Sequence, residues 1–184
     1  MYYFMRQNLF EPLDIIEVVG PTELLEKFIW IEGQRFSEDI PRQTLLLDPS
    51  YGKRMADFFD TTIPLMSDRL LKALRRLGVR NIDSYPMTLK RPDTGEEWDN
   101  YWAVNVIGCI DAVNLEKSQY RTDSFGEPDF TKIVLNEEVV GEVDLFRLVK
   151  GPGLMVVNQK IKEALSPAGF MALMFQEVGD YDGT

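Results

Sequence analysis

Two segments of the chain, residues 64–85 and 155–176, share one pattern of apolar and polar positions. Each begins with a short apolar run followed by a residue whose side-chain oxygen can cap a helix N-terminus, Ser67 in the first and Asn158 in the second. Apolar residues then recur at helical spacing up to a glycine that can end a helix, and a second apolar run follows. The pattern predicts a strand, a helix and a strand in each segment.

The predicted helix of the first segment is amphipathic. One side carries leucines, and the remaining positions include a basic group made up of Arg69, Lys72, Arg75 and Arg76. Basic residues late in a helix complement the negative end of its dipole or pair with nearby carboxylates, and a partner surface is the alternative interpretation. In the second segment Pro167 is expected to end or bend the helix near Leu165, because its ring clashes with a preceding carbonyl.

The rest of the chain predicts further strands and loops. Strands are expected at residues 2–5, 14–19 and 44–47, with a short helix after Pro21, and "RPDTGEEWDN" reads as the turn of a hairpin. The stretch "TKIVLNEEVVGEVDLFRLVKGPG" predicts two strands around a turn near residues 136–138. The chain is therefore predicted to form an α+β fold with mixed sheets.

The domain organisation follows from the same pattern. Residues 1–60 are expected to supply strands and loops that complete the fold, and residues 61–184 are expected to form the core with the two repeated units. No low-complexity linker separates the units. One compact domain is expected, and two half-domains packed together are the alternative.

The composition indicates the size of the core and the cellular compartment. The chain has 184 residues, of which 45% are hydrophobic, enough for one sizeable core or two small ones. Its longest apolar runs, such as "FMALMF", are too short to cross a bilayer, and its start lacks the layout of a secretory signal. The single cysteine, Cys109, excludes an internal disulfide and agrees with a reducing compartment. A cytoplasmic protein without a membrane partner is expected.

The charge is strongly negative. Thirty acidic residues against twenty basic ones, with no histidine, give a formal charge of −10, which would repel a phosphate backbone, so nucleic acid is not expected as a ligand. The acidic residues concentrate in two clusters. The first comprises Asp93, Glu96, Glu97 and Asp99, and the second comprises Asp123, Glu127, Asp129, Glu137, Glu138, Glu142 and Asp144. They are either solvated surface or a surface that attracts a basic partner.

The residue inventory offers little chemistry. Without histidine, neither a Ser-His or Cys-His nucleophile nor the common nitrogen and sulfur zinc site can form. The terminal "GDYDGT" resembles the start of a calcium loop but lacks the later ligands, and "KGPGLM" reads as a turn rather than a phosphate loop. Cys109 lies in an apolar strand and is expected to act as a small hydrophobe. No catalytic residue, metal site or cofactor is predicted.

A set of short motifs is similar to a known family. The motifs, in order, are Asp57-Phe58, Pro64-Leu65-Met66-Ser67, Tyr101, Asn105, Asp111-Ala112, Ser118, "DLFRL" and "VVNQKIKEAL". Their order and spacing over residues 57–178 resemble the Imm11 immunity-protein family. The resemblance implies a small cytoplasmic protein of a bacterial polymorphic toxin system, which binds a cognate toxin domain and protects the producing cell. It implies no catalytic residues.

Three functions remain open at this point. The first is an immunity protein that occludes its toxin, and the second is an interaction or assembly module without a toxin partner. The third, a carboxylate-based hydrolase using pairs such as Glu96/Glu97 or Asp57/Asp60, is disfavoured because thirty acidic residues produce such pairs by chance.

The partner-binding residues are expected in the two acidic clusters, where carboxylates lie beside aromatic side chains. The toxin is expected to be basic, for example a nuclease with a positive groove that carboxylates can cover. The predicted contact residues are Glu96, Glu97, Trp98, Asp99, Asp123, Phe125, Glu127 and Asp129. The alternative is that these aromatic residues, and Phe130 with them, belong to the core while the carboxylates are merely solvated.

Overall fold

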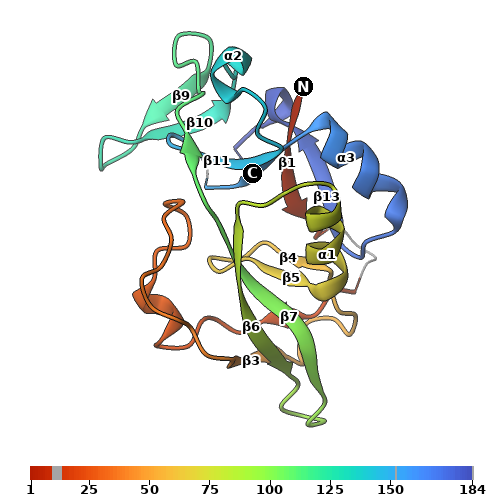
Figure 1. The fold of residues 1–184 in the computed structure, drawn as a ribbon. Helices are drawn as coiled ribbons and strands as arrows, with labels where there is room; N and C mark the ends of the chain where they lie inside the picture. The colour runs from red at the N-terminus through yellow and green to blue at the C-terminus, as the bar shows by residue number, and fades with distance from the viewer. Residues whose placement is uncertain (10–13, 152, 184) are drawn as a thin grey trace.

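Two mixed β-sheets make up most of the fold, which the computed structural model describes over residues 1–9, 14–151 and 153–183 (Figure 1). The six-stranded sheet has the order β2-β3-β6-β7-β5-β4, the five-stranded sheet has the order β13-β1-β12-β11-β8, and β9 and β10 pair separately. The strands are β1 (Tyr2–Gln7), β2 (Glu17–Val18), β3 (Gln43–Asp48), β4 (Phe58–Phe59), β5 (Leu65–Ser67), β6 (Ile82–Lys90), β7 (Glu97–Val106), β8 (Cys109–Ile110), β9 (Gln119–Thr122), β10 (Pro128–Lys132), β11 (Leu145–Leu148), β12 (Met155–Asn158) and β13 (Leu173–Glu177). The predicted α+β class is confirmed.

Three α-helices and three 3₁₀ turns connect the strands in the described part of the chain. They are α1 (Asp68–Arg76), α2 (Glu137–Val140), α3 (Gln159–Leu165), η1 (Leu25–Lys27), η2 (Ser166–Ala168) and η3 (Val178–Asp180). The second long helix ends at Leu165, as Pro167 predicted, and the chain passes through η2 to Gly169 in the left-handed conformation (φ 64°).

The two repeated segments have the same topology. Strands β5 and β6 both lie antiparallel to β7, which runs between them, and α1 connects the two outer strands. In the second unit β12 and β13 both lie antiparallel to β1, and α3 connects them. Each unit is thus a strand-helix-strand crossover with a reversed strand inserted between its parallel strands.

The strand registers match as well. Leu65 and Tyr85 lie on either side of Ala103 in the first sheet, and Val156 and Gln176 lie on either side of Phe4 in the second. Leu65 and Tyr85 of the first unit therefore correspond to Val156 and Gln176 of the second, and each pair is separated by 91 positions in the chain. The prediction of two related units holds at the level of element order and pairing register.

The units differ in the origin of their middle strand. In the first unit, β7 follows β6 directly through a hairpin. In the second, the middle strand is β1, which precedes every other described element in the chain and pairs with residues 150 or more positions later.

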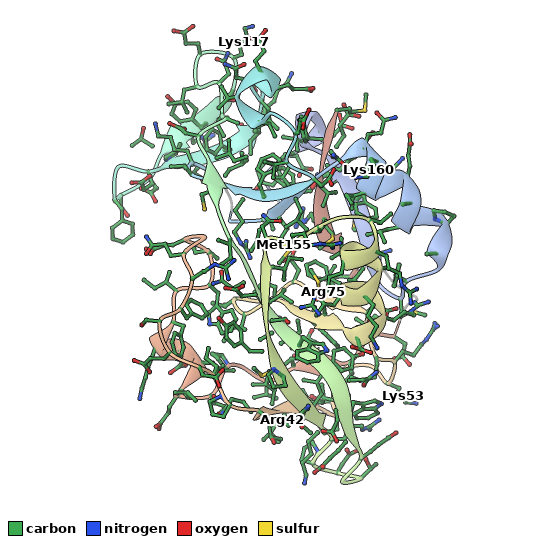
Figure 2. The ribbon with its side chains drawn as sticks, viewed as in Figure 1. Arg42, Lys53, Arg75, Lys117, Met155 and Lys160 are labelled. Carbon is green, nitrogen blue, oxygen red and sulfur yellow. The ribbon has the colours of Figure 1, made fainter. Side chains whose placement is uncertain are left out.

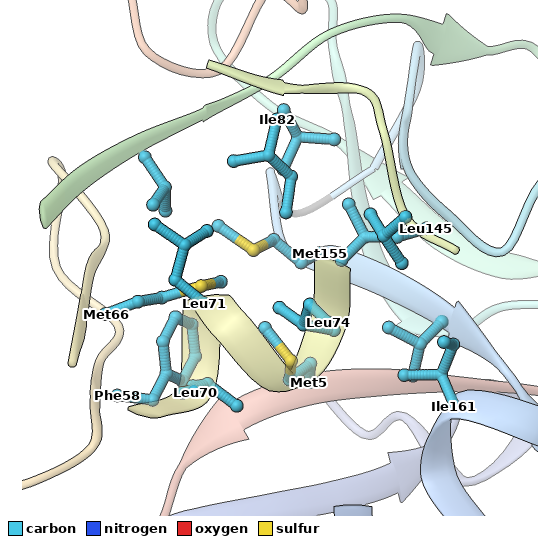
Figure 3. Close-up of a cluster of buried hydrophobic side chains, with 14 of the residues drawn as sticks. Met5, Phe58, Met66, Leu70, Leu71, Leu74, Ile82, Leu145, Met155 and Ile161 are labelled. Carbon is cyan, nitrogen blue, oxygen red and sulfur yellow. The ribbon is translucent and has the colours of Figure 1, made fainter. Parts of the chain in front are cut away.

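One hydrophobic cluster joins the two sheets. Leu70, Leu71 and Leu74 of α1 are almost fully buried, and Figure 3 shows them among side chains from both sheets. The six-stranded sheet contributes Phe58, Met66 and Ile82, and the five-stranded sheet contributes Met5, Leu145 and Met155. The apolar side predicted for this amphipathic helix is thus the side that packs against both sheets.

One local prediction was wrong, and one hairpin was not predicted. The expected turn near residues 136–138 is the short helix α2, whose first turn carries two glutamates and whose Val140 is buried against the second sheet. Carboxylates at a helix N-terminus interact favourably with the helix dipole, and burial of Val140 adds packing. The polar stretch before it contains the β9–β10 hairpin. All four residues of β9 are exposed, so the alternation that marks a strand is missing.

Candidate partner-binding surfaces

The eight predicted contact residues lie at opposite ends of the molecule. Glu96, Glu97, Trp98 and Asp99 lie at the free end of the β6–β7 hairpin, near Arg42, whereas Asp123, Phe125, Glu127 and Asp129 belong to the β9–β10 hairpin, at the end where Lys117 lies (Figures 1 and 2). The structure therefore does not bring the two clusters together into one patch.

Two of the predicted acidic contact residues of the β6–β7 hairpin, Glu97 and Asp99, have partners within the protein. Glu97 accepts a hydrogen bond from Lys90 Nζ at 2.6 Å, and Asp99 accepts one from the Thr88 hydroxyl at 2.6 Å. Trp98 is half-buried and packs against the core cluster of the first sheet. These contacts give part of the hairpin a structural role.

The β9–β10 hairpin presents a different surface. Asp123 Oδ1 accepts hydrogen bonds from the backbone N–H groups of Phe125 (2.8 Å) and Glu127 (2.9 Å), so this carboxylate stabilises the turn. Phe125 is 88% exposed, whereas Phe130 is 3% exposed and belongs to the core. Glu127 and Asp129 are both exposed. An aromatic ring held in solvent beside exposed carboxylates is the arrangement expected of an interface anchor.

A cavity of about 510 Å³ lies between the segment around residues 31–34 and the β8–β11 edge of the second sheet. Its walls are formed by one charged residue, Glu32, and by polar, apolar and glycine residues, namely Ile31, Gln34, Cys109, Leu148, Val149, Gly151 and Gly153. The two chain segments meet because Gly108 N–H donates to the Gly33 carbonyl at 2.8 Å. A Cβ atom on Gly33 would lie 2.8 Å from Cys109 Sγ, so only glycine permits this approach.

Arg147 of β11 lies beside this cavity and is 2% exposed. Its strand partner in the parallel register is Cys109, which lines the cavity. Nη1 donates to the carbonyl of Gly153, another lining residue, but within the described residues Nε and Nη2 have no hydrogen-bond partner. Burial without full hydrogen bonding is costly for a guanidinium, and burial lowers the pKa of Arg147.

A second buried polar side chain has the same arrangement. Asn105 is fully buried, and its Nδ2 donates to the carbonyl of Gln34, which also lines the cavity, at 2.7 Å. Its Oδ1 has no partner among the described residues. One acceptor, Asn105 Oδ1, and two donors, Arg147 Nε and Nη2, are thus buried without a hydrogen-bond partner among the described residues.

Asp60 is the carboxylate that acts on Arg147. Burial raises the pKa of Asp60 to about 6, although the charges of Arg6 and Arg147 oppose the rise. Asp60 acts on Arg147 through electrostatic attraction, and the two side chains form no hydrogen bond with each other. The charge of Asp60 therefore acts on the buried guanidinium without a hydrogen bond between them.

The cavity and Arg147 were not predicted from the sequence. The available signal was an arginine inside the otherwise apolar run "DLFRL", since a charged side chain in a buried strand calls for a partner. The cavity itself has no local signal, because it depends on the approach of segments about 75 residues apart.

The described residues contain neither a cluster of metal-ligating side chains nor a membrane-spanning helix. Over residues 1–9, 14–151 and 153–183, no three cysteine, aspartate or glutamate side chains converge so that they could hold a metal ion. Within the same ranges, no helix is both long and apolar enough to span a membrane.

Comparison with known families shows to which family the chain belongs. The model of the immunity protein family Imm11 matches residues 10–180, which include both repeated units. The chain belongs to the Imm11 immunity protein family. The family resemblance of the short motifs is thereby confirmed, and an immunity role in general follows for this Imm11 protein. A comparison with curated proteins finds no match.

Proposed function

We propose that this Imm11 protein binds a cognate toxin domain and neutralises it by covering its active surface, without catalysing a reaction itself. The observation that carries the proposal is the family match over residues 10–180. The exposed aromatic and acidic groups described above supply a surface suited to such a partner.

The contact surface that we propose is the tip of the β9–β10 hairpin. Phe125 supplies apolar area that no other part of the described protein covers, and Glu127 and Asp129 supply negative charge beside it. A partner with a basic surface, such as a nuclease, would associate faster because opposite charges steer the encounter. The β6–β7 hairpin is the weaker candidate, since Glu97 and Asp99 are already hydrogen-bonded within the protein and Trp98 is packed against the core.

Co-expression tests the proposal. The toxin domain would be taken from the reading frame beside this gene and expressed with or without the Imm11 protein, and growth and direct binding would be measured. We expect rescue of growth and formation of a stable complex. A toxin that kills equally in the presence of the protein and does not bind it would contradict the proposal.

Matched variants locate the surface. Phe125→Asp should weaken binding by at least about tenfold if Phe125 is an interface anchor, since truncating such residues costs more than about 1 kcal/mol. Tyr51→Asp is the control, because Tyr51 is also exposed (53%) but lies outside the hairpin. Equal affinities of the two variants would remove the hairpin from the interface and leave the immunity role standing.

A further inference from the structure

The outer edge of β9 is unpaired within the described structure. β9 pairs only with β10, and all four of its residues are exposed. Among the other edge strands, β2, β4 and β8 have two residues each, and residues 173–176 of β13 are half-buried. An unpaired strand edge presents a row of backbone N–H and C=O groups to another chain. β9 is therefore the longest fully exposed edge in the described part of the protein.

The pairing register shows which backbone groups of β9 face solvent. Hydrogen-bonded and non-hydrogen-bonded residue pairs alternate along two antiparallel strands. Asp123 N–H donates to the Glu127 carbonyl at 2.8 Å, so the next hydrogen-bonded pair lies two positions further along each strand. Tyr120 and Thr122 belong to the non-hydrogen-bonded pairs, and their N–H and C=O groups point away from β10. Two donors and two acceptors thus lie along one exposed edge.

The outer edge of β10, by contrast, is protected at two places. Pro128 lies opposite Thr122 and has no N–H to donate. The Phe130 carbonyl lies against the C-terminal segment, since a Cβ atom on Gly183 would lie 3.1 Å from its oxygen. A proline and a covering segment are two of the devices that keep a strand edge from pairing with another chain. β9 contains no proline, and no other described strand pairs with it.

Charge favours a basic partner at this edge over a second copy of the chain. Two copies with a formal charge of −10 each repel one another, whereas the exposed carboxylates of Glu127 and Asp129 on the same hairpin attract a basic strand. Tyr120 is 41% exposed and packs on Phe130, with ring centroids 5.4 Å apart, so it offers apolar surface to a cross-strand side chain. A third strand would also stabilise the hairpin, because two-stranded sheets are marginally stable alone.

We propose that a strand of the bound toxin domain pairs with the outer edge of β9 and extends the β9–β10 hairpin to three strands. The proposal deepens the proposed function and rests on it. Main-chain hydrogen bonds to Tyr120 and Thr122 would supply affinity, and Phe125, 88% exposed at the tip, would contact the partner beside the added strand. The hairpin lies at the periphery of the molecule, away from the six-stranded sheet (Figure 1).

The first test measures amide hydrogen exchange in the wild-type protein, free and bound to the catalytically inactivated toxin domain. The Tyr120 and Thr122 amides face solvent in the free protein and should exchange rapidly. In the complex we expect their exchange to slow by at least about 50-fold, because both would donate to the added strand. The Arg121 amide is the internal control, since it points toward β10 in the free protein and in the complex alike.

The second test compares Thr122→Pro with Thr122→Val. Proline removes the outward N–H at this position, and it should be tolerated because that N–H takes no part in the ladder with β10. Valine keeps the N–H and a branched side chain. We expect Thr122→Pro to weaken binding of the toxin domain by at least about tenfold, and Thr122→Val to stay within about twofold of the wild type. Urea midpoints of both variants check that the fold persists.

The outcomes separate the two proposals. If the wild-type protein does not bind the toxin domain, the proposed function fails. If it binds while the Tyr120 and Thr122 amides exchange as fast as before, or if a folded Thr122→Pro variant binds as tightly as Thr122→Val, strand pairing is overturned and the function stands. Protection that appears without toxin and grows with protein concentration would assign the edge to a second copy and also overturn it. If Thr122→Pro does not fold, the exchange result decides, because it is read on the wild-type protein.

Discussion

Asp57 and Asp144 accept hydrogen bonds from the residues that cap α1 and α3, Ser67 and Asn158. Asp57 Oδ1 accepts a hydrogen bond from Ser67 Oγ at 2.5 Å, and Asp144 Oδ1 accepts one from Asn158 Nδ2 at 2.7 Å. The same carboxylates also pair with the base two positions after each cap, at 2.6 Å for Arg69 Nη2 and 2.9 Å for Lys160 Nζ. The cap, the acid and the base thus recur as a set in both units.

The caps themselves were predicted from the sequence, but their acidic partners were not. Ser67 and Asn158 stand at the start of a periodic run, which is a local signal. Asp57 and Asp144 precede their caps by 10 and 14 residues, because the connecting loops differ in length. No short-range pattern predicts such a pair, and only the matching strand register shows that the acids correspond.

Removing the caps should affect the units unequally. Ser67 is 4% exposed, and its partner Asp57 also accepts the backbone N–H of Met171 at 2.8 Å, so Ser67→Ala disturbs a buried network. We expect it to lower the free energy of unfolding by about 2 kcal/mol. Asn158→Ala, at a less buried cap, should cost about 1 kcal/mol. Urea unfolding of both variants checks the order, and a larger loss for Asn158→Ala would contradict it.

Asp60 should make stability depend on pH in the direction opposite to an ion-paired carboxylate. Its pKa of about 6 lies above the unfolded value, so the folded state binds more protons between about pH 4 and pH 6. Stability should therefore fall as the pH rises through this window. Asp60→Asn should be more stable than the wild type by up to about 3 kcal/mol at pH 8 and should lose this advantage near pH 4. Denaturant titrations at both pH values measure it, and a constant difference would contradict the assignment.

At the scale of elements, the two hairpins differ, although the sequence predicted both to contact the partner. The acidic-aromatic pattern is the same in each, yet Trp98 packs on the core while Phe125 remains in solvent. The pattern cannot distinguish them, because burial depends on which sheet lies beneath the strand. The β6–β7 hairpin was predicted from its turn residues and strong β propensity, whereas β9 and β10 lack those signals.

Charge reversal should separate the hairpins kinetically. We expect Glu127→Lys with Asp129→Lys to slow association with the toxin domain by about tenfold at low salt and to weaken its salt dependence, because steering acts through exposed charge. The matched variant Glu96→Lys with Glu97→Lys should have a smaller effect. Stopped-flow measurements across salt concentrations test this ranking, and the opposite ranking would move the interface to the β6–β7 end.

At the scale of the whole molecule, the repeat accounts for the core. The two crossover units place α1 and both sheets around one hydrophobic cluster, which draws residues from β1 near the start of the chain and from β12 near its end. The sequence repeat predicted the crossover units, since each is continuous along the chain. It did not predict that β1 completes the second unit, because β1 lies outside the repeated segment.

A circular permutant tests this description. Joining residue 183 to residue 1 through a linker of roughly ten glycine and serine residues, and opening the chain within 10–13, would place β1 after β13, as β7 follows β6. We expect a cooperative folded protein with circular dichroism like that of the parent. A permutant that remains unfolded in the absence of denaturant would show that the order of β1 in the chain matters for more than connectivity.

The place of β1 also determines the order of events during synthesis. Strand β1, the middle strand of the second unit, leaves the ribosome about 150 residues before its partners β12 and β13. At typical elongation rates this delay is on the order of ten to thirty seconds. The first unit contains its own middle strand and can assemble during that interval. The apolar residues of β1 stay without their sheet until β12 and β13 have been made, so this strand is exposed to aggregation and to chaperones during that interval.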